Sequence, residues 1–141
     1  MDNNRYQAEL RVLQNKLAPN LYKFIDMDSE MPYIVMAART NRGNVYTLRI
    51  ELDRFPTEIP KVFVLKMLKT KEGKAMNDCS ASMHTLSSER GWTRICHYGS
   101  SWTPAISIYK VYVRCRLWLE MYEQHLKTGY PLDYYLDHDS M

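Results

Sequence analysis

Apolar side chains near the start of the chain recur at intervals of three and four residues, which is the spacing of one helix face. The positions that follow this spacing are Tyr6, Leu10, Leu13 and Leu17. Asn3 or Asn4 offers a side chain suited to the N-cap, and Pro19 prevents continuation. The pattern predicts an amphipathic helix over residues 4–17.

The middle of the chain changes to shorter apolar runs that are separated by turn residues. Their β-branched and aromatic content is typical of strands. The predicted strands cover residues 21–27, 33–39, 45–52 and 62–65. The turn residues Asn41-Arg42-Gly43-Asn44 indicate a hairpin between the second and third strands, and Pro56 and Pro60 exclude a central strand at 55–60. The arrangement predicted from these runs is a four-stranded antiparallel meander.

Residues 66–102 show little periodicity and predict a long irregular connection, of a kind that is often functional. Helical spacing then returns, with Thr103 as N-cap, Pro104 at the first helical position and Gly129 as the stop. These signals predict one helix over residues 104–127. The expected fold is α+β in a single domain over residues 1–141: an N-terminal helix, a four-stranded antiparallel meander, a long loop and a C-terminal helix.

Composition narrows the function classes. The chain has 141 residues, of which 45% are hydrophobic and 25% charged, and its net charge of +3 is not gathered in a dense basic run. Charge therefore gives no reason to expect a nucleic-acid partner. We expect a cytoplasmic protein without a membrane partner, because no apolar run approaches the ~20 residues of a membrane span and the N-terminus lacks a signal-peptide pattern. Three cysteines, an odd number, favour reduced thiols over a disulfide framework.

One of these thiols has a distinctive position. Cys96 ends the irregular segment, shortly before Trp102-Thr103-Pro104. A thiol in such a loop is a candidate nucleophile, and Arg94 offers positive potential beside it. The simpler interpretation is that Cys96 is a small buried apolar residue. Cys115 falls on the apolar face of the last predicted helix, and Cys79 has no supporting motif, so both are expected to be structural or incidental.

The surroundings of Cys96 resemble the active-site segment of ubiquitin-conjugating enzymes. In that family Ile-Cys is followed by a short loop, Trp-Ser/Thr-Pro-Ala and a long helix, and here the chain has Ile95-Cys96 and then Trp102-Thr103-Pro104-Ala105. Phe55-Pro56 and Pro60 match in kind the family's Tyr-Pro-x-x-Pro-Pro signature, with Lys61 in place of its last proline.

The chain ending resembles one branch of that family. A helix followed by Thr128-Gly129-Tyr130 is similar to the bacterial ubiquitin-conjugating-like proteins of anti-phage and ubiquitin-like operons, including those beside cyclic-oligonucleotide synthases. The resemblance implies a transferase in antiviral defence. It implies that Cys96 accepts a ubiquitin-like modifier as a thioester from an activating enzyme and passes it to a target lysine, without a metal or organic cofactor. It also implies that the first helix docks the activating enzyme through Arg5, Arg11 and Lys16, although each is equally explained as the solvated side of an amphipathic helix.

The resemblance is incomplete at the family's His-Pro-Asn triplet. His84 lies near that position but is followed by Thr85 and Leu86, so only the bracing role of the histidine is carried over and the asparagine is missing. Support for the oxyanion must come from elsewhere, and the candidates by chemistry are Ser87, Ser88, Ser100 and Ser101. His97 is a candidate base for an incoming lysine, or lies in solvent. Trp102 is expected to anchor the active-site loop.

Three other interpretations remain open. The first is a catalytically inactive relative that uses the same fold to bind a ubiquitin-like protein or peptide, as the missing asparagine suggests. The second is a zinc site, for which the spacing is poor, built from Cys79, His84, Cys96 and His97. The third is nucleic-acid binding by lysines that are more simply a solvated loop, namely Lys66, Lys69, Lys71 and Lys74.

Overall fold

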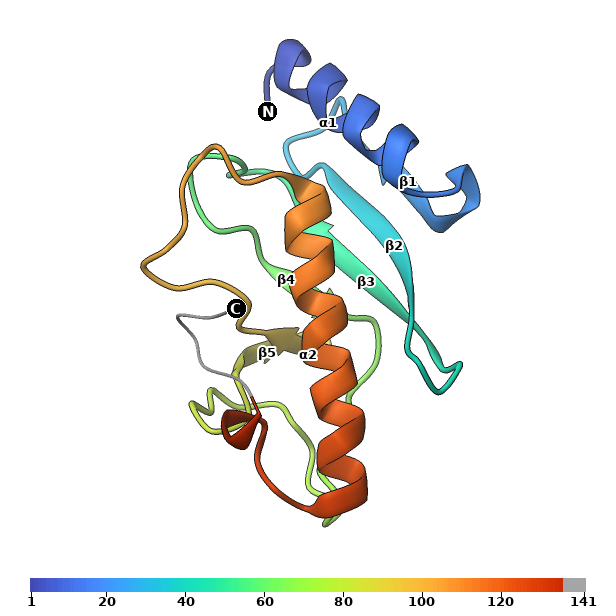
Figure 1. Ribbon diagram of the computed structural model, residues 1–141. Helices are drawn as coiled ribbons and strands as arrows, with labels where there is room; N and C mark the ends of the chain where they lie inside the picture. Colours follow the sequence, from blue (N-terminus) through green and yellow to red (C-terminus); the bar gives the residue numbers. More distant parts are fainter. Residues whose placement is uncertain (136–141) are drawn as a thin grey trace.

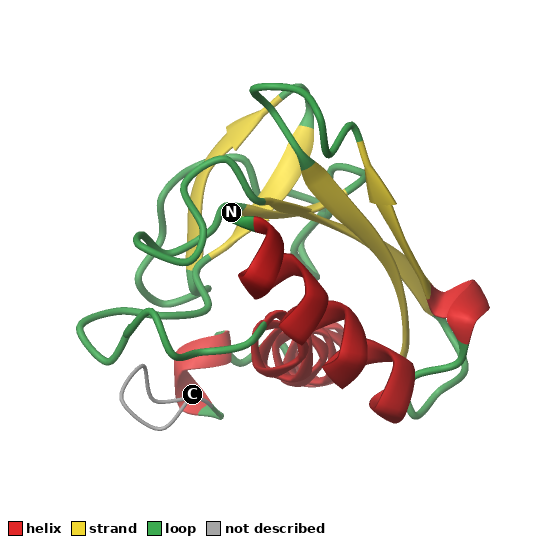
Figure 2. Cartoon of the chain, turned by 90° about the horizontal axis from the view of Figure 1, so that it is seen from above, coloured by secondary structure: helices red, strands yellow, loops and turns green. Residues whose placement is uncertain are grey.

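The computed structural model describes residues 1–135, which form an α+β fold with one antiparallel sheet and two main helices. The elements are α1 (Asn3–Lys16), β1 (Tyr22–Ile25), β2 (Tyr33–Arg39), β3 (Val45–Glu51), β4 (Val62–Val64), β5 (Thr85–Glu89), β6 (Trp92–Ile95) and α2 (Ile108–Thr128), with short 3-10 turns at Pro19–Leu21 and Leu132–Tyr134. The strand order is β1-β2-β3-β4-β6-β5 (Figure 1). Both helices lie on the same side of the curved sheet (Figure 2).

The N-terminal half follows the predicted pattern closely. Asp2 caps α1, because its carboxylate accepts the Arg5 N–H at 2.8 Å, one residue before the predicted caps. Strand β2 has the predicted bounds, and its alternate residues Ile34, Met36 and Ala38 are buried against the helices. The predicted helix and the first four strands are confirmed, with element ends that differ by a few residues.

The sheet has six strands, so the predicted four-stranded meander is wrong. The two extra strands, β5 and β6, lie within the segment 66–102 that was expected to be irregular. Their sequences are short and polar on one face, so periodicity gave little signal. Strand β6 forms because it pairs with β4, with Val62 opposite Ile95. Strand β5 then pairs with β6, because Gly91 at φ +74° allows the chain to reverse between β5 and β6. These two pairings place β6 inside the sheet, between β4 and the edge strand β5.

The last helix begins four residues later than its sequence signals indicate. Thr103 and Pro104 form a separate turn, in which the Ile106 N–H reaches the Thr103 carbonyl at 3.1 Å. The N-cap of α2 is Ser107, whose hydroxyl accepts the Lys110 N–H at 3.1 Å. The predicted stop is confirmed, because Gly129 adopts φ +81° and its N–H bonds to the His125 carbonyl.

A single apolar cluster joins the sheet and both helices. Trp118, Leu119 and Val111 of α2 are completely buried against it, and Leu13 of α1 closes its other side. The loop before α2 is attached to this cluster, because Tyr98 belongs to it and Trp102 and Ile106 pack against it.

Candidate active site

Cys96 lies immediately after β6, at the beginning of the loop that leads to α2. Side chains alternate through this region, so that Thr93, Ile95 and His97 enter the core while Arg94 and Cys96 are only half-buried. Cys96 therefore lies on the sheet face opposite the helices, on the same side as Arg94. It is accessible in part, unlike Cys115, which is completely buried in α2.

The surroundings of Cys96 favour the protonated thiol. Burial raises the pKa of Cys96, the thiol of Cys79 raises it further, and the positive charge of Arg94 opposes both effects. The sequence placed Arg94 correctly as a source of positive potential. It did not reveal that Cys79, in the loop before β5, lies close enough to influence Cys96.

His84 holds the backbone at the nucleophile. Its carbonyl accepts the Cys96 N–H at 2.9 Å and the indole N–H of Trp118 at 3.0 Å. The imidazole is buried, and its Nε2 lies 3.0 Å from an oxygen of Asp133. His84 thus joins the residue after β6, the helix α2 and the segment after α2 at one point. Asp133 was not among the predicted site residues, because its contact spans distant parts of the chain.

His97 lies on the opposite side of the strand from Cys96. Its imidazole is buried, and Nε2 donates a hydrogen bond to the Pro60 carbonyl at 2.9 Å. Burial lowers the pKa of His97 to about 4, and the charges of Arg114 and Arg94 act in the same direction. The ring is therefore neutral at pH 7 and turned into the core. This placement does not support the predicted role as a base beside Cys96, and it gives His97 a structural role between the loop and Pro60.

Aromatic side chains fix the loop after Cys96. Trp102 donates its indole N–H to the Pro56 carbonyl at 3.1 Å and lies edge-on to Tyr98, with ring centroids 5.3 Å apart. The guanidinium of Arg114 covers the other side of Tyr98 at 3.7 Å and donates to the His97 carbonyl. Trp102 thus lies where a loop anchor is expected. Tyr98 and Arg114 were missed, since nothing in their spacing shows that α2 meets this loop.

Ser100 and Ser101 lie at the exposed tip of the same loop. A turn closes there, with the Trp102 N–H on the Gly99 carbonyl at 3.2 Å. Ser87 and Ser88 lie on β5, and the Ser88 N–H donates a hydrogen bond to the Asn77 carbonyl. The loop after Cys96 therefore carries two exposed hydroxyl groups, those of Ser100 and Ser101.

The three cations predicted to dock an activating enzyme have different environments. The guanidinium of Arg5 is engaged within the molecule, because it pairs with Glu9 at 2.9 Å and donates to the carbonyls of Pro104 and Ile106. Arg11 and Lys16 are exposed on α1. The structure thus leaves two of the three guanidinium and ammonium groups available to a partner.

The geometry gives little support to two of the alternative interpretations. Among residues 1–135 no three or more His, Cys, Asp or Glu side chains are arranged to hold a metal ion, and the ring of His97 is directed at Pro60. Two of the four loop lysines also have partners inside the molecule. Lys66 lies 4.9 Å above the ring of Tyr46, and Lys71 donates to the Lys127 carbonyl.

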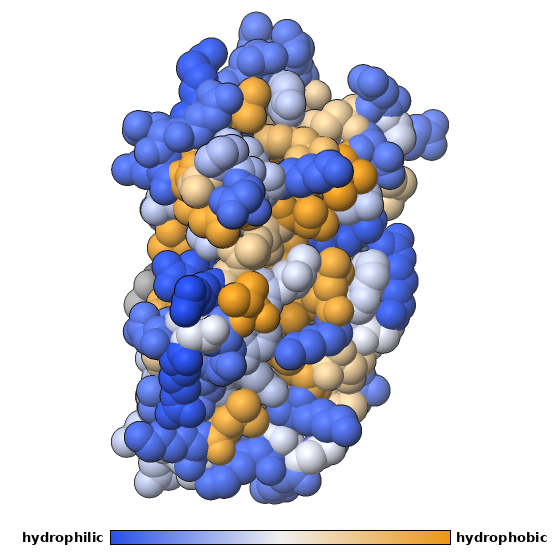
Figure 3. Space-filling view, turned by 90° about the vertical axis from the view of Figure 1, so that its right-hand side faces the viewer, coloured by the Kyte–Doolittle hydropathy of each residue, from blue (hydrophilic) through white to orange (hydrophobic). Residues whose placement is uncertain are grey.

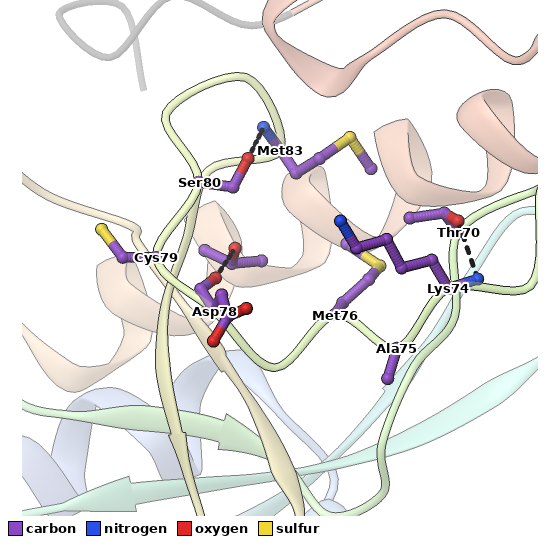
Figure 4. A pocket seen from close by; sticks show the side chains of 9 residues that line it. Thr70, Lys74, Ala75, Met76, Asp78, Cys79, Ser80 and Met83 are labelled. Atoms are coloured by element: carbon purple, nitrogen blue, oxygen red, sulfur yellow. Dashed lines mark hydrogen bonds between the residues drawn. The ribbon is translucent and has the colours of Figure 1, made fainter.

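A cavity of about 320 Å³ lies beside β5, between the loop 70–83 and the strand (Figure 4). Met76, Met83 and Lys74 extend toward its middle, whereas the sulfur of Cys79 points away from it. Its polar atoms are partly engaged already, since the Thr85 hydroxyl donates to the Asp78 carbonyl at 2.8 Å. The cavity is next to the thiol-bearing segment, because Thr85 pairs with Ile95.

Comparison with models of known protein families, with curated proteins and with solved structures gave no match. Within residues 1–135, neither helix combines the length and the apolar character that a bilayer crossing needs.

Proposed function

We propose that this chain is a conjugating protein of the ubiquitin-conjugating type, in which Cys96 carries a ubiquitin-like modifier as a thioester. An activating enzyme supplies the modifier, and an amine of a target protein, such as a lysine, receives it. The proposal includes a place in a bacterial anti-phage pathway, to which the resemblance of the chain ending points. The activity requires no resident metal or organic cofactor.

The position of Cys96 is the observation that carries the proposal. The thiol is half-buried just after β6, an interior strand of the sheet, and the Cys96 N–H is fixed by the His84 carbonyl at 2.9 Å. The following loop is held by Trp102 on the Pro56 carbonyl. A partly accessible cysteine on a rigid segment suits a reaction in which large partners must bring a carbonyl carbon to one sulfur.

The proposed reaction has two exchanges. In the first, the Cys96 thiolate attacks the thioester carbon of the modifier, and the cysteine of the activating enzyme leaves as a thiolate. In the second, the target amine attacks the Cys96 thioester and loses a proton, an amide bond forms, and the Cys96 thiolate leaves. Arg94 is the charged residue that favours the thiolate in both exchanges. Because His97 is buried and neutral, the proton of the amine goes to solvent or to a group of the partner.

An inactive binding module is the second candidate, and one observation favours it. Burial raises the pKa of Cys96, so the thiolate is scarcer at neutral pH than for an ordinary cysteine. With the family's asparagine also missing, the chain lacks two aids to catalysis. The same fold would then hold a ubiquitin-like protein or peptide without forming a bond to it.

The deciding experiment combines the purified chain with a candidate activating enzyme, its ubiquitin-like modifier and ATP. Intact-mass measurement and a non-reducing gel follow the modifier on the chain. We expect an adduct that disappears with thiol reductant and does not form in Cys96→Ala. Cys96→Ser should yield an oxygen ester that survives reductant. The matched control Cys79→Ser should still be charged, at least as fast as the parent, because Cys79 is exposed and its thiol raises the pKa of Cys96.

Two outcomes would contradict the proposal. An adduct that persists in Cys96→Ala would place the chemistry at another residue. If the activating enzyme charges itself and binds this chain, and yet no adduct forms, the chain is the inactive binding module.

A further inference from the structure

A groove of about 590 Å³ crosses the surface between the end of α1, the β2–β3 hairpin and the outer side of α2. Its apolar lining includes Leu17 and Leu21 from the α1 side, Tyr109 and Val113 from α2, and Val45 from the hairpin. Val45 is 60% exposed and Val113 44% exposed. Figure 3 shows apolar side chains gathered in the upper half of this face of the molecule. Such a concentration of exposed apolar side chains is typical of an interaction surface.

The charges along the groove all have one sign. Lys16, Arg39 and Arg116 line it, and its lining, which lies wholly within residues 1–135, contains no Asp or Glu. Glu120, one turn further along α2, is engaged by the backbone N–H of Asn41 at 2.9 Å. An occupant with carboxylates around an apolar stripe would complement this surface in both charge and polarity.

The backbone edge beside the groove is closed to an added strand. Strand β1 covers β2 only as far as the pair of Tyr22 and Met36, which leaves the last residues of β2 beyond its end. Their carbonyls are taken by side chains of α2: the hydroxyl of Tyr112 donates to the Ala37 carbonyl at 2.8 Å, and Arg116 donates to the Arg39 carbonyl at 3.0 Å. An occupant must therefore bind through side chains, as a helix laid in a groove does.

We propose that this groove binds an acidic amphipathic helix of a partner protein. Leucine-type side chains of that helix lie over Leu17, Leu21 and Val113, and its carboxylates face Lys16, Arg39 and Arg116. The surface is formed without Cys96, so this inference stands whether or not the chain carries a modifier.

Two fluorescein-labelled peptides of about 15 residues, near the shortest length that forms a helix in water, test the inference. They share one leucine stripe at helical spacing and differ only in having Glu or Lys at every polar position. We expect fluorescence anisotropy to show that the Glu peptide binds about tenfold more tightly than the Lys peptide. A third peptide, with Glu retained and the leucines replaced by serine, should lose binding, because charge alone does not fill the apolar groove.

Variants of the chain then locate the site. Lys16→Glu and Val113→Ser each remove a groove contact and should weaken binding of the Glu peptide severalfold, with Lys16→Glu improving binding of the Lys peptide. Arg11→Glu is the matched control, because it makes the same charge change on α1 outside the groove lining. Thermal unfolding of each variant checks that the fold is retained.

Three results would overturn the inference. The first is equal binding of the Glu and Lys peptides, and the second is a loss in Arg11→Glu as large as that in Lys16→Glu. The third is a dimer of the chain alone in sedimentation that Val113→Ser dissociates, because the occupant would then be a second copy of this chain.

Discussion

The junction between the two helices allows a quantitative prediction. Glu9 is buried in α1, and its carboxylate accepts the Ile108 N–H at 2.7 Å, which is the first N–H of α2. Its other oxygen pairs with Arg5 at 2.9 Å. Glu9 is therefore both a remote cap for α2 and the counter-charge of an arginine that also ties the segment before α2. We predict that Glu9→Ala strongly destabilises the fold.

The magnitude follows from burial. The side chains of Arg5 and Glu9 are 21% and 5% exposed, and Ile108 is completely buried. Removing one partner of a buried ion pair lowers the free energy of unfolding by about 3–5 kcal/mol, and leaving a buried N–H without an acceptor lowers it by about 1–3 kcal/mol. The two losses are not added here, because the same Glu9 carboxylate makes both contacts. Because Arg5 keeps two carbonyl partners, we expect the lower end, about 3 kcal/mol, which is roughly 10 °C in Tm for a chain of this size. Glu9→Gln keeps an acceptor for Ile108 and should cost about 1–2 kcal/mol.

The chain contains a matched control for this variant. Arg54 and Glu58 form a pair with the same sequence spacing and a similar distance of 3.0 Å, but their side chains are 74% and 55% exposed. Glu58→Ala should cost less than about 0.5 kcal/mol. Urea unfolding followed by circular dichroism measures both variants. A loss below about 1 kcal/mol in Glu9→Ala, or equal losses in the two, would refute the reasoning that burial determines the value of this pair.

Three further predictions concern protonation and backbone geometry. Because the folded pKa of His97 is about 4, below the ~6.5 of an unfolded histidine, the unfolded state binds more protons and stability falls as pH drops from 6.5 to 4. The loss reaches about 3 kcal/mol, and unfolding at a series of pH values should show a shallower slope in His97→Gln. Gly129→Ala should cost about 1–2 kcal/mol at φ +81°, whereas Gly99→Ala, at a position without positive φ or nearby atoms, should be neutral by thermal unfolding. Alkylation of Cys96, followed by mass measurement, should keep accelerating above the pH at which the free thiol of a model peptide levels off, because burial raises its pKa; an earlier plateau would contradict this.

Local chemistry explains which elements were predictable. The spacing of Leu10 and Leu13, the residues suited to an N-cap and the turn around Gly43 each act over a few neighbouring positions, so α1 and the β2–β3 hairpin follow from the sequence. The stop at Gly129 belongs to the same class, since the left-handed conformation there is open to glycine at little cost. The loop position of Cys96 was likewise visible in the sequence.

Other features depend on contacts between distant residues. Strand β6 exists because Ile95 pairs with Val62, and α2 starts at Ile108 rather than at Pro104 because Ser107 caps it and Glu9 binds its first N–H from 99 residues away. Such contacts leave no periodicity in the sequence, and loop closure over that length is compensated only when the whole core forms.

The sequence by itself therefore determined the α+β class, the outer bounds of most elements and the choice of Cys96 as the thiol to test. Only the tertiary structure decided the six-stranded sheet, the direction of the His97 ring into the core and the raised pKa of Cys96. The physical reason is that caps and turns act over a few residues, whereas side-chain direction, burial and the pKa values that follow from them depend on which distant segments pack together.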